Sequence, residues 1–157
     1  MARLEVHAPD LQAAMTVLGR QPILASDPPR NLYHVDLRAA DLRDAHLDRV
    51  LLAEARLQGA QLARAHLPQA DLFRIHLQAA DLRDADLTKA GLRGAHLERA
   101  QLDGARLQGA DLRGAHLDGT DLRAADLHGA MLRDATATAE TTWPAGFDWA
   151  AAGVKRR

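Results

Sequence analysis

The sequence contains no cysteine, which excludes disulfide bonds, thiolate metal sites and cysteine nucleophiles. Aromatic residues make up only 3% of the chain, so any core has to be built from small aliphatic side chains, mainly alanine and leucine. No stretch approaches the ~18 consecutive apolar residues of a membrane span, and the first residues lack the continuous apolar segment of a signal peptide. We therefore expect a soluble, cytoplasmic chain.

Charge of one sign is not in excess either. The 157 residues include 20 Lys and Arg and 21 Asp and Glu, for a formal net charge of −1. A chain with so little net charge has no overall field that attracts nucleic acid or an anionic membrane. We expect no direct nucleic-acid binding and no membrane contact by this chain, and its length fits one domain.

What the sequence has instead is a repeat of five residues. Leucine stands at every fifth position from Leu32 to Leu132, 21 times without a break, and alanine stands two residues before most of these leucines. The unit is Ala-x-Leu-x-x, and the residues that replace its alanine include Val35, Val50, Ile75 and Thr120.

A period of five suits neither a regular helix nor a flat strand. In an α-helix, residues five apart are rotated by ~140° from one to the next, so the leucines form no stripe. In a strand they alternate between the two faces. They are buried together if the chain turns a corner once per repeat, with Ala and Leu inward and the other three residues outward. The sequence thus predicts a coil wound around its own leucines.

The runs ADLRGAHL and ADLRDADLTKAGLRGAHL resemble the pentapeptide-repeat family, whose consensus is alanine, Asp or Asn, leucine and two variable positions. This resemblance implies an all-β solenoid, a right-handed quadrilateral β-helix with four repeats per coil. Residues 30–134 would then form about five coils, a rod roughly 25 Å long at the usual strand spacing. Because leucine and alanine fill the interior, we expect any binding to occur on the outside or at an end.

The outward positions fit such corners. Glycine often follows the leucine by two residues, where a tight turn needs a permissive backbone. Aspartate often precedes the leucine, where its carboxylate can accept hydrogen bonds from turn amides.

Residues 1–29 are expected to form an N-terminal cap, since a solenoid exposes apolar interior and unpaired backbone at both ends. Pro9 and Asp10 mark the start of a short helix over about residues 9–18, and Gly19 marks its end. An irregular connector follows. The segment DLQAAMTVLGRQP also resembles one that precedes the repeats in some family members, sometimes behind membrane segments. The chain could thus be the soluble part of a longer, membrane-anchored relative.

Residues 135–157 are expected to form a C-terminal cap with a basic tail. The leucine rhythm ends after Leu132, and three of the chain's five aromatic residues follow: Trp143, Phe147 and Trp149. Aromatic side chains at the end of an aliphatic rod most simply cover it. The stretch TWPAGFD resembles the tails of actinobacterial-type family members, in which a proline stands where this chain has Trp149.

Histidines are the strongest candidates for a metal site. His76, His96 and His116 are twenty residues apart, so four repeats per coil would stack them on one side, and His46 and His66 would stack in the same way. Parallel outward rings do not converge on one zinc ion without adjustment. We therefore expect a solvated polar ladder, with no metal or cofactor, although the role of the histidines stays open.

Other candidates for chemistry are weak. Asp84 and Asp86 could be imagined as a general acid and base, but nothing in the pattern supplies a dry, concave site. Ser26, the only serine, has no sign of a partner base or oxyanion hole. We expect no catalytic residues and no enzyme activity.

The function most consistent with these patterns is a non-enzymatic scaffold that presents a rigid charged surface to a protein partner. The alternative comes from the resemblance, because some family members mimic DNA, bind DNA gyrase and protect it from quinolones. Such a mimic needs an acidic surface, whereas residues 30–134 hold 16 acidic and 15 basic side chains, many of them in Asp-Leu-Arg triplets. A continuous acidic side would favour the mimic.

The resemblance also leaves open a homodimer, because family members often pair through their terminal caps. Trp143, Phe147 and Trp149 are the residues expected to form such a contact. The sequence names no partner and does not say which side of the rod is functional.

Overall fold

The computed structural model describes residues 28–157. The helix expected over residues 9–18, Ser26 and nearly all of the expected N-terminal cap lie outside the described residues. Within residues 28–157 there is no helix long and apolar enough to cross a bilayer.

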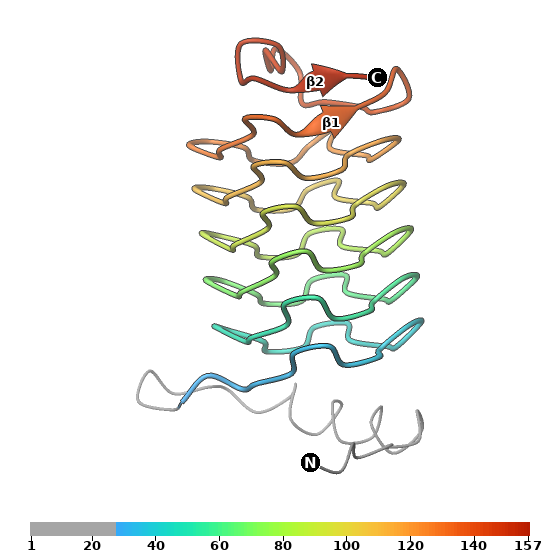
Figure 1. Cartoon of the computed structure of the whole chain (residues 1–157), viewed down its shortest axis with the longest axis vertical. Helices are drawn as coiled ribbons and strands as arrows, with labels where there is room; N and C mark the ends of the chain where they lie inside the picture. Colours follow the sequence, from blue (N-terminus) through green and yellow to red (C-terminus); the bar gives the residue numbers. More distant parts are fainter. Residues whose placement is uncertain (1–27) are drawn as a thin grey trace.

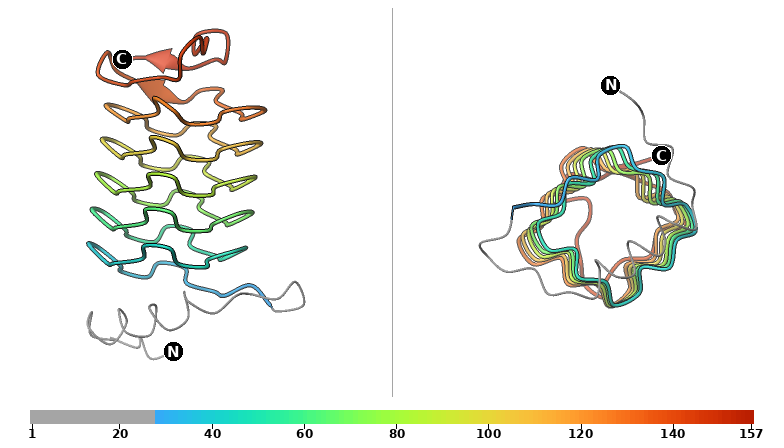
Figure 2. Two further views of the ribbon diagram at one scale, coloured as in Figure 1. Left: turned by 180° about the vertical axis from the view of Figure 1, so that it is seen from behind. Right: turned by 90° about the horizontal axis from the view of Figure 1, so that it is seen from below.

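Residues 31–136 wind into a stack of four-sided coils. Parallel bridges join residues that are twenty apart, from Asn31 with Leu51 to His116 with Thr136, so each coil contains four pentapeptides. Figure 1 shows the coils stacked along the long axis, and Figure 2 shows their four-cornered outline seen from below. The corner once per repeat and the four repeats per coil are both confirmed.

The coils pair through single-residue bridges because each side is too short for an extended strand. Only two strands occur within the described residues, β1 (Thr136–Ala137) and β2 (Lys155–Arg156). They pair in parallel, with Thr136 opposite Lys155.

Each corner is a turn closed by a backbone hydrogen bond from the residue at the alanine position to the preceding repeat leucine. For example, the Ala60 N–H donates to the Leu57 carbonyl oxygen at 3.0 Å. The second residue after the leucine has a positive φ at every corner from His34 to Asp134 except at Ala124, as at the third position of a type II turn. Gly59 meets this need with φ 67°, yet 13 residues other than glycine, including Glu54 at φ 58°, adopt the same conformation. The stacking of the coils therefore imposes a conformation that glycine only makes easier.

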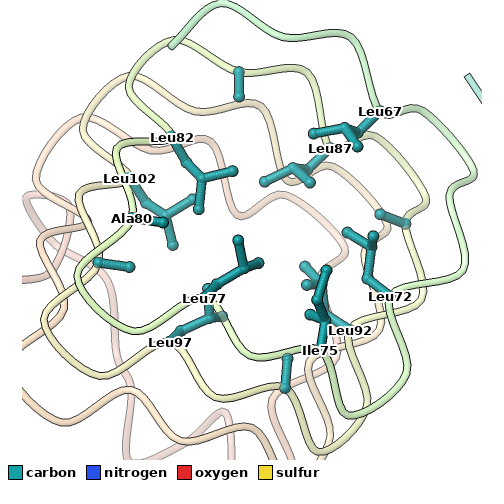
Figure 3. Close-up of a cluster of buried hydrophobic side chains, with 14 of the residues drawn as sticks. Leu67, Leu72, Ile75, Leu77, Ala80, Leu82, Leu87, Leu92, Leu97 and Leu102 are labelled. Carbon is teal, nitrogen blue, oxygen red and sulfur yellow. The ribbon is translucent and has the colours of Figure 1, made fainter. Parts of the chain in front are cut away.

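The core is a column of leucine and alanine along the axis. Every repeat leucine from Leu37 to Leu132 is at most 7% exposed. In Figure 3, Leu77 and Leu97 of neighbouring coils lie next to each other and point into the interior. Thr120 takes an alanine position and is fully buried, where its hydroxyl donates to the Leu97 carbonyl oxygen at 2.8 Å. The predicted inward and outward positions are confirmed.

After Ala137 the chain crosses the last coil in a wider path. Thr142 pairs with Asp121, twenty-one residues away, before β2 returns to pair with β1. The rings of Trp143 and Phe147 stack with their centroids 5.5 Å apart. Together with Trp149 they are half-buried against the core, at the end of the stack shown in Figure 1. That this segment acts as a cap stays a prediction.

Candidate interaction surface

Outward side chains form columns, because residues twenty apart stand above one another. One of the four sides carries three histidines, and we call it the histidine side. It consists of residues 35–39, 55–59, 75–79, 95–99, 115–119 and 135–139.

The predicted histidine stacks are present. The rings of His76 and His96 are 4.8 Å apart and inclined by 6°, and those of His96 and His116 are 4.7 Å apart and inclined by 4°. On another side, His46 stacks on His66 at 4.9 Å. Burial, with the charges of His96 and Arg56, lowers the pKa of His76. His76 is therefore neutral at physiological pH, and a neutral ring stacks without like-charge repulsion.

The Asp-Leu-Arg triplets form closed ion pairs. In one of them, the Asp111 carboxylate accepts the Arg113 backbone N–H at 3.2 Å and two guanidinium hydrogen bonds at 2.8 and 2.6 Å. Arginine also forms this pair at Asp36, Asp41, Asp81 and Asp121.

These arginines hold the neighbouring carboxylates in their charged form. The hydrogen bond from Arg123, helped by one from Thr142, lowers the pKa of Asp121 to about 2. The pKa values of Asp36, Asp81 and Asp111 are lowered for the same reason. Groups that stay ionised near neutral pH are poor proton donors, so these carboxylates are unsuited to general acid catalysis.

Asp84 and Asp86 do not form an acid–base pair. Asp86 accepts the Thr88 hydroxyl at 2.6 Å and pairs with Arg106 at 3.4 Å, whereas Asp84 is exposed and belongs to the adjoining side. Burial raises the pKa of Asp86, but the bonds from Thr88 and the charge of Arg106 outweigh it and the net change is a decrease.

No side of residues 30–134 carries a net charge larger than two. The side with the most acidic residues carries six acidic and four basic side chains, and the other three sides have net charges of +1, 0 and 0. The six acidic residues include Asp41, Asp44, Asp81 and Asp121, each of which pairs with an arginine. No continuous acidic surface results.

The sequence did not reveal a column of polar atoms without partners beside the histidines. Five buried side-chain oxygens within residues 28–157 accept or donate no hydrogen bond, and all five lie in one column of the histidine side. They belong to Gln58, Gln78, Glu98, Asp118 and Thr138. The only signal in the sequence is their shared position, two residues after the residue of the histidine column.

Glu98 brings this column into contact with the histidines. Its Oε1 lies 3.3 Å from His96 Nδ1, and potential ligand atoms of His96, Glu98 and His116 all lie within 4.8 Å of one another. The structure thus gathers three candidate ligands where the sequence predicted only a stack of rings.

An open groove lies at the C-terminal end of the stack. Its lining includes Trp143, Trp149 and Arg156 together with small residues of the segment that follows β1. The groove places two of the three aromatic residues predicted for a dimer contact next to open space.

Coils of four pentapeptides around an aliphatic core define a right-handed quadrilateral β-helix. The family model described as pentapeptide repeats matches eight copies, over residues 31–69, 70–109 and 100–136. The chain belongs to the pentapeptide-repeat family. No curated protein matches the chain significantly.

Solved structures with a similar fold include a pentapeptide repeat protein, Rfr23, from the cyanobacterium Cyanothece 51142. It is 29% identical, with 73% of this chain and 88% of that chain covered and a TM-score of 0.56. A pentapeptide repeat protein from Nostoc PCC 7120 is 36% identical over 76% of this chain and 86% of that chain, with a TM-score of 0.32. QnrB1, a plasmid-mediated fluoroquinolone resistance protein, is 18% identical over 81% of this chain and 80% of that chain, with a TM-score of 0.45.

Proposed function

We propose that the protein is a non-enzymatic scaffold whose outer side chains bind a protein partner. The observation that carries this proposal is the fixed arrangement of those side chains, in columns held by ion pairs such as Asp111 with Arg113 and by ring stacks such as His96 on His116. A surface that is already ordered loses little conformational entropy on binding. Leucine and alanine fill the interior of the coils, which leaves the outside as the binding surface.

A pull-down from the native host tests this proposal. Arg93, Arg99, Gln101 and Arg106 are exposed and lie on the four successive sides of one coil. The test compares the wild type with Arg93→Glu, Arg99→Glu, Gln101→Arg and Arg106→Glu, each checked for an unchanged circular dichroism spectrum. We expect one protein to be retained by the wild type but lost from the variant of one side, or from the variants of two adjoining sides. Identical retention by all five proteins, or none by the wild type, would contradict the proposal.

The paired charges argue against the alternative of a DNA mimic that binds gyrase. A mimic has to present free negative charge, whereas even the most acidic side has an excess of only two acidic residues and arginines neutralise most of its carboxylates. We expect no change in gyrase supercoiling, with or without a quinolone, at micromolar protein. Protection of gyrase in this assay would support the mimic instead.

Self-association through the C-terminal groove is part of the proposal. Trp143 and Trp149 are half-buried and line the groove, so a second copy could cover apolar surface that this chain leaves partly open.

A further inference from the structure

The strongest unexplained feature of the surface is the cluster of His96, Glu98 and His116. All three side chains are half-buried, and their potential ligand atoms lie within 4.8 Å of one another. They come from two adjacent coils, because His96 and Glu98 stand on residues 95–99 and His116 on the coil above. Nothing in the scaffold function requires this convergence.

The donor set is that of a borderline divalent metal ion. Two imidazole nitrogens and one carboxylate oxygen suit zinc and its neighbours better than magnesium or calcium, which prefer oxygen ligands. Bonds of about 2.0 to 2.2 Å to a tetrahedral zinc place neighbouring ligand atoms roughly 3.3 to 3.5 Å apart. His96 Nδ1 and Glu98 Oε1, at 3.3 Å, already meet this spacing. His116 has to approach by about 1.5 Å at most and its ring has to turn out of the parallel stack with His96, and rotation of the half-buried His116 side chain supplies both changes.

The column of unpartnered oxygens is negatively charged at this place, whereas its other members, Gln58, Gln78 and Thr138, are neutral. Glu98 Oε2 is buried and has no hydrogen-bond partner, and directly above it in the column Asp118 Oδ1 is buried without a partner as well. Arg157 reaches the other oxygen of Asp118, at 3.4 Å, but no such contact satisfies Glu98 Oε2. A buried carboxylate oxygen without a donor is costly, and a bound cation removes that cost.

The other histidine stack provides a contrast within the same molecule. His46 and His66 stack at 4.9 Å, much like His96 and His116 at 4.7 Å. Within residues 28–157, however, no carboxylate joins His46 and His66 in a group of three ligands. Stacking alone therefore does not make a metal site, and Glu98 makes the difference.

We propose that His96, Glu98 and His116 bind one zinc-like divalent transition-metal ion, with the remaining coordination position open to solvent. The bound ion joins two adjacent coils of the histidine side. This site adds to the scaffold function and does not depend on the identity of its partner.

Isothermal titration calorimetry with zinc chloride tests the proposal, on the full chain purified without a histidine tag. We expect one zinc ion per chain. Glu98→Gln keeps the size of the side chain and should weaken binding at least about tenfold, while His116→Ala should weaken it by about 100-fold or more, because each removes a direct ligand. His46→Ala is the matched control and should bind as the wild type does, and calcium should give no binding heat.

Equal zinc affinity in the wild type, Glu98→Gln and His116→Ala would overturn the proposal, and so would an equal loss in His46→Ala. X-ray absorption of the zinc-loaded wild type gives a test that needs no variant. Two imidazole nitrogens and a carboxylate oxygen at about 2.0 to 2.2 Å are expected. A zinc ion surrounded by water oxygens alone would refute the site.

Discussion

Leu51 and Leu52 allow the direction of the side chains to be tested with adjacent residues of the same type. Leu52 is a repeat leucine with 0% exposure, whereas Leu51 precedes it, points outward and is half-buried. Leu52→Ala removes three buried carbon atoms, which contribute about 0.8 kcal/mol each through burial alone. The cavity left between the neighbouring coils raises the expected loss of unfolding free energy to about 3 kcal/mol. Leu51→Ala should cost less than about 1 kcal/mol, since its side chain is only half-buried.

Urea unfolding followed by circular dichroism measures both losses. Because repeat solenoids can unfold in parts, the comparison rests on the midpoint and the slope of the same transition in both variants. A lower midpoint for Leu52→Ala with an unchanged slope is the expected result. Equal losses for the two variants, or a larger loss for Leu51→Ala, would refute the inward placement of every fifth residue.

Three further predictions concern acid, the corners and the end of the stack. The pKa of Asp121 is lowered from 3.8 to about 2, so its ion pair stabilises the folded state by about 1 to 2 kcal/mol after solvent screening. This stabilisation is complete above pH 3.8 and is lost as the pH falls toward 2. Asp121→Asn should thus lower the free energy of unfolding at neutral pH but change it little near pH 2. Urea unfolding that gave the same loss at both pH values would be inconsistent with this ion pair. Gly59 (φ 67°) and Ala39 (φ 54°) occupy the same corner column, and an added Cβ at Gly59 meets no atom within 4 Å. Gly59→Ala should lower the unfolding free energy by about 1 kcal/mol, and Ala39→Gly should raise it by about the same amount. If the melting temperatures of both variants shifted in the same direction, the role of the positive φ would be contradicted. For Trp149→Asp, light scattering should show a dimer becoming a monomer, whereas a dimer that persists in the variant would exclude the groove as its contact.

The sequence predicted the core of this molecule well, because the pattern that fixes it is local. One leucine every five residues is buried together only if the chain turns once per repeat, and the leucines from Leu37 to Leu132 are buried as that reasoning requires. The histidine stacks follow from the same register once four repeats form a coil. The number four came from the family resemblance, since the spacing of the leucines does not determine it.

Other features depended on contacts between coils that the sequence does not encode in a visible pattern. The positive φ at residues such as Glu54 arises from stacking, because an isolated residue of this type avoids that conformation. The convergence of Glu98 on His96 and His116 depends on side-chain rotamers, and no spacing rule specifies them. The wider path at Thr142 reflects one extra residue relative to the coil below.

A partner protein on the outside of the solenoid can be detected most directly by photo-crosslinking in the native host. A photo-reactive amino acid replaces Arg93, Arg99, Gln101 or Arg106 in turn, one on each side of the same coil. We expect one protein to crosslink strongly from one side, or from two adjoining sides, and not from the opposite side. Absence of a crosslinked protein from all four positions, or equal crosslinking of the same proteins from all four, would contradict this expectation.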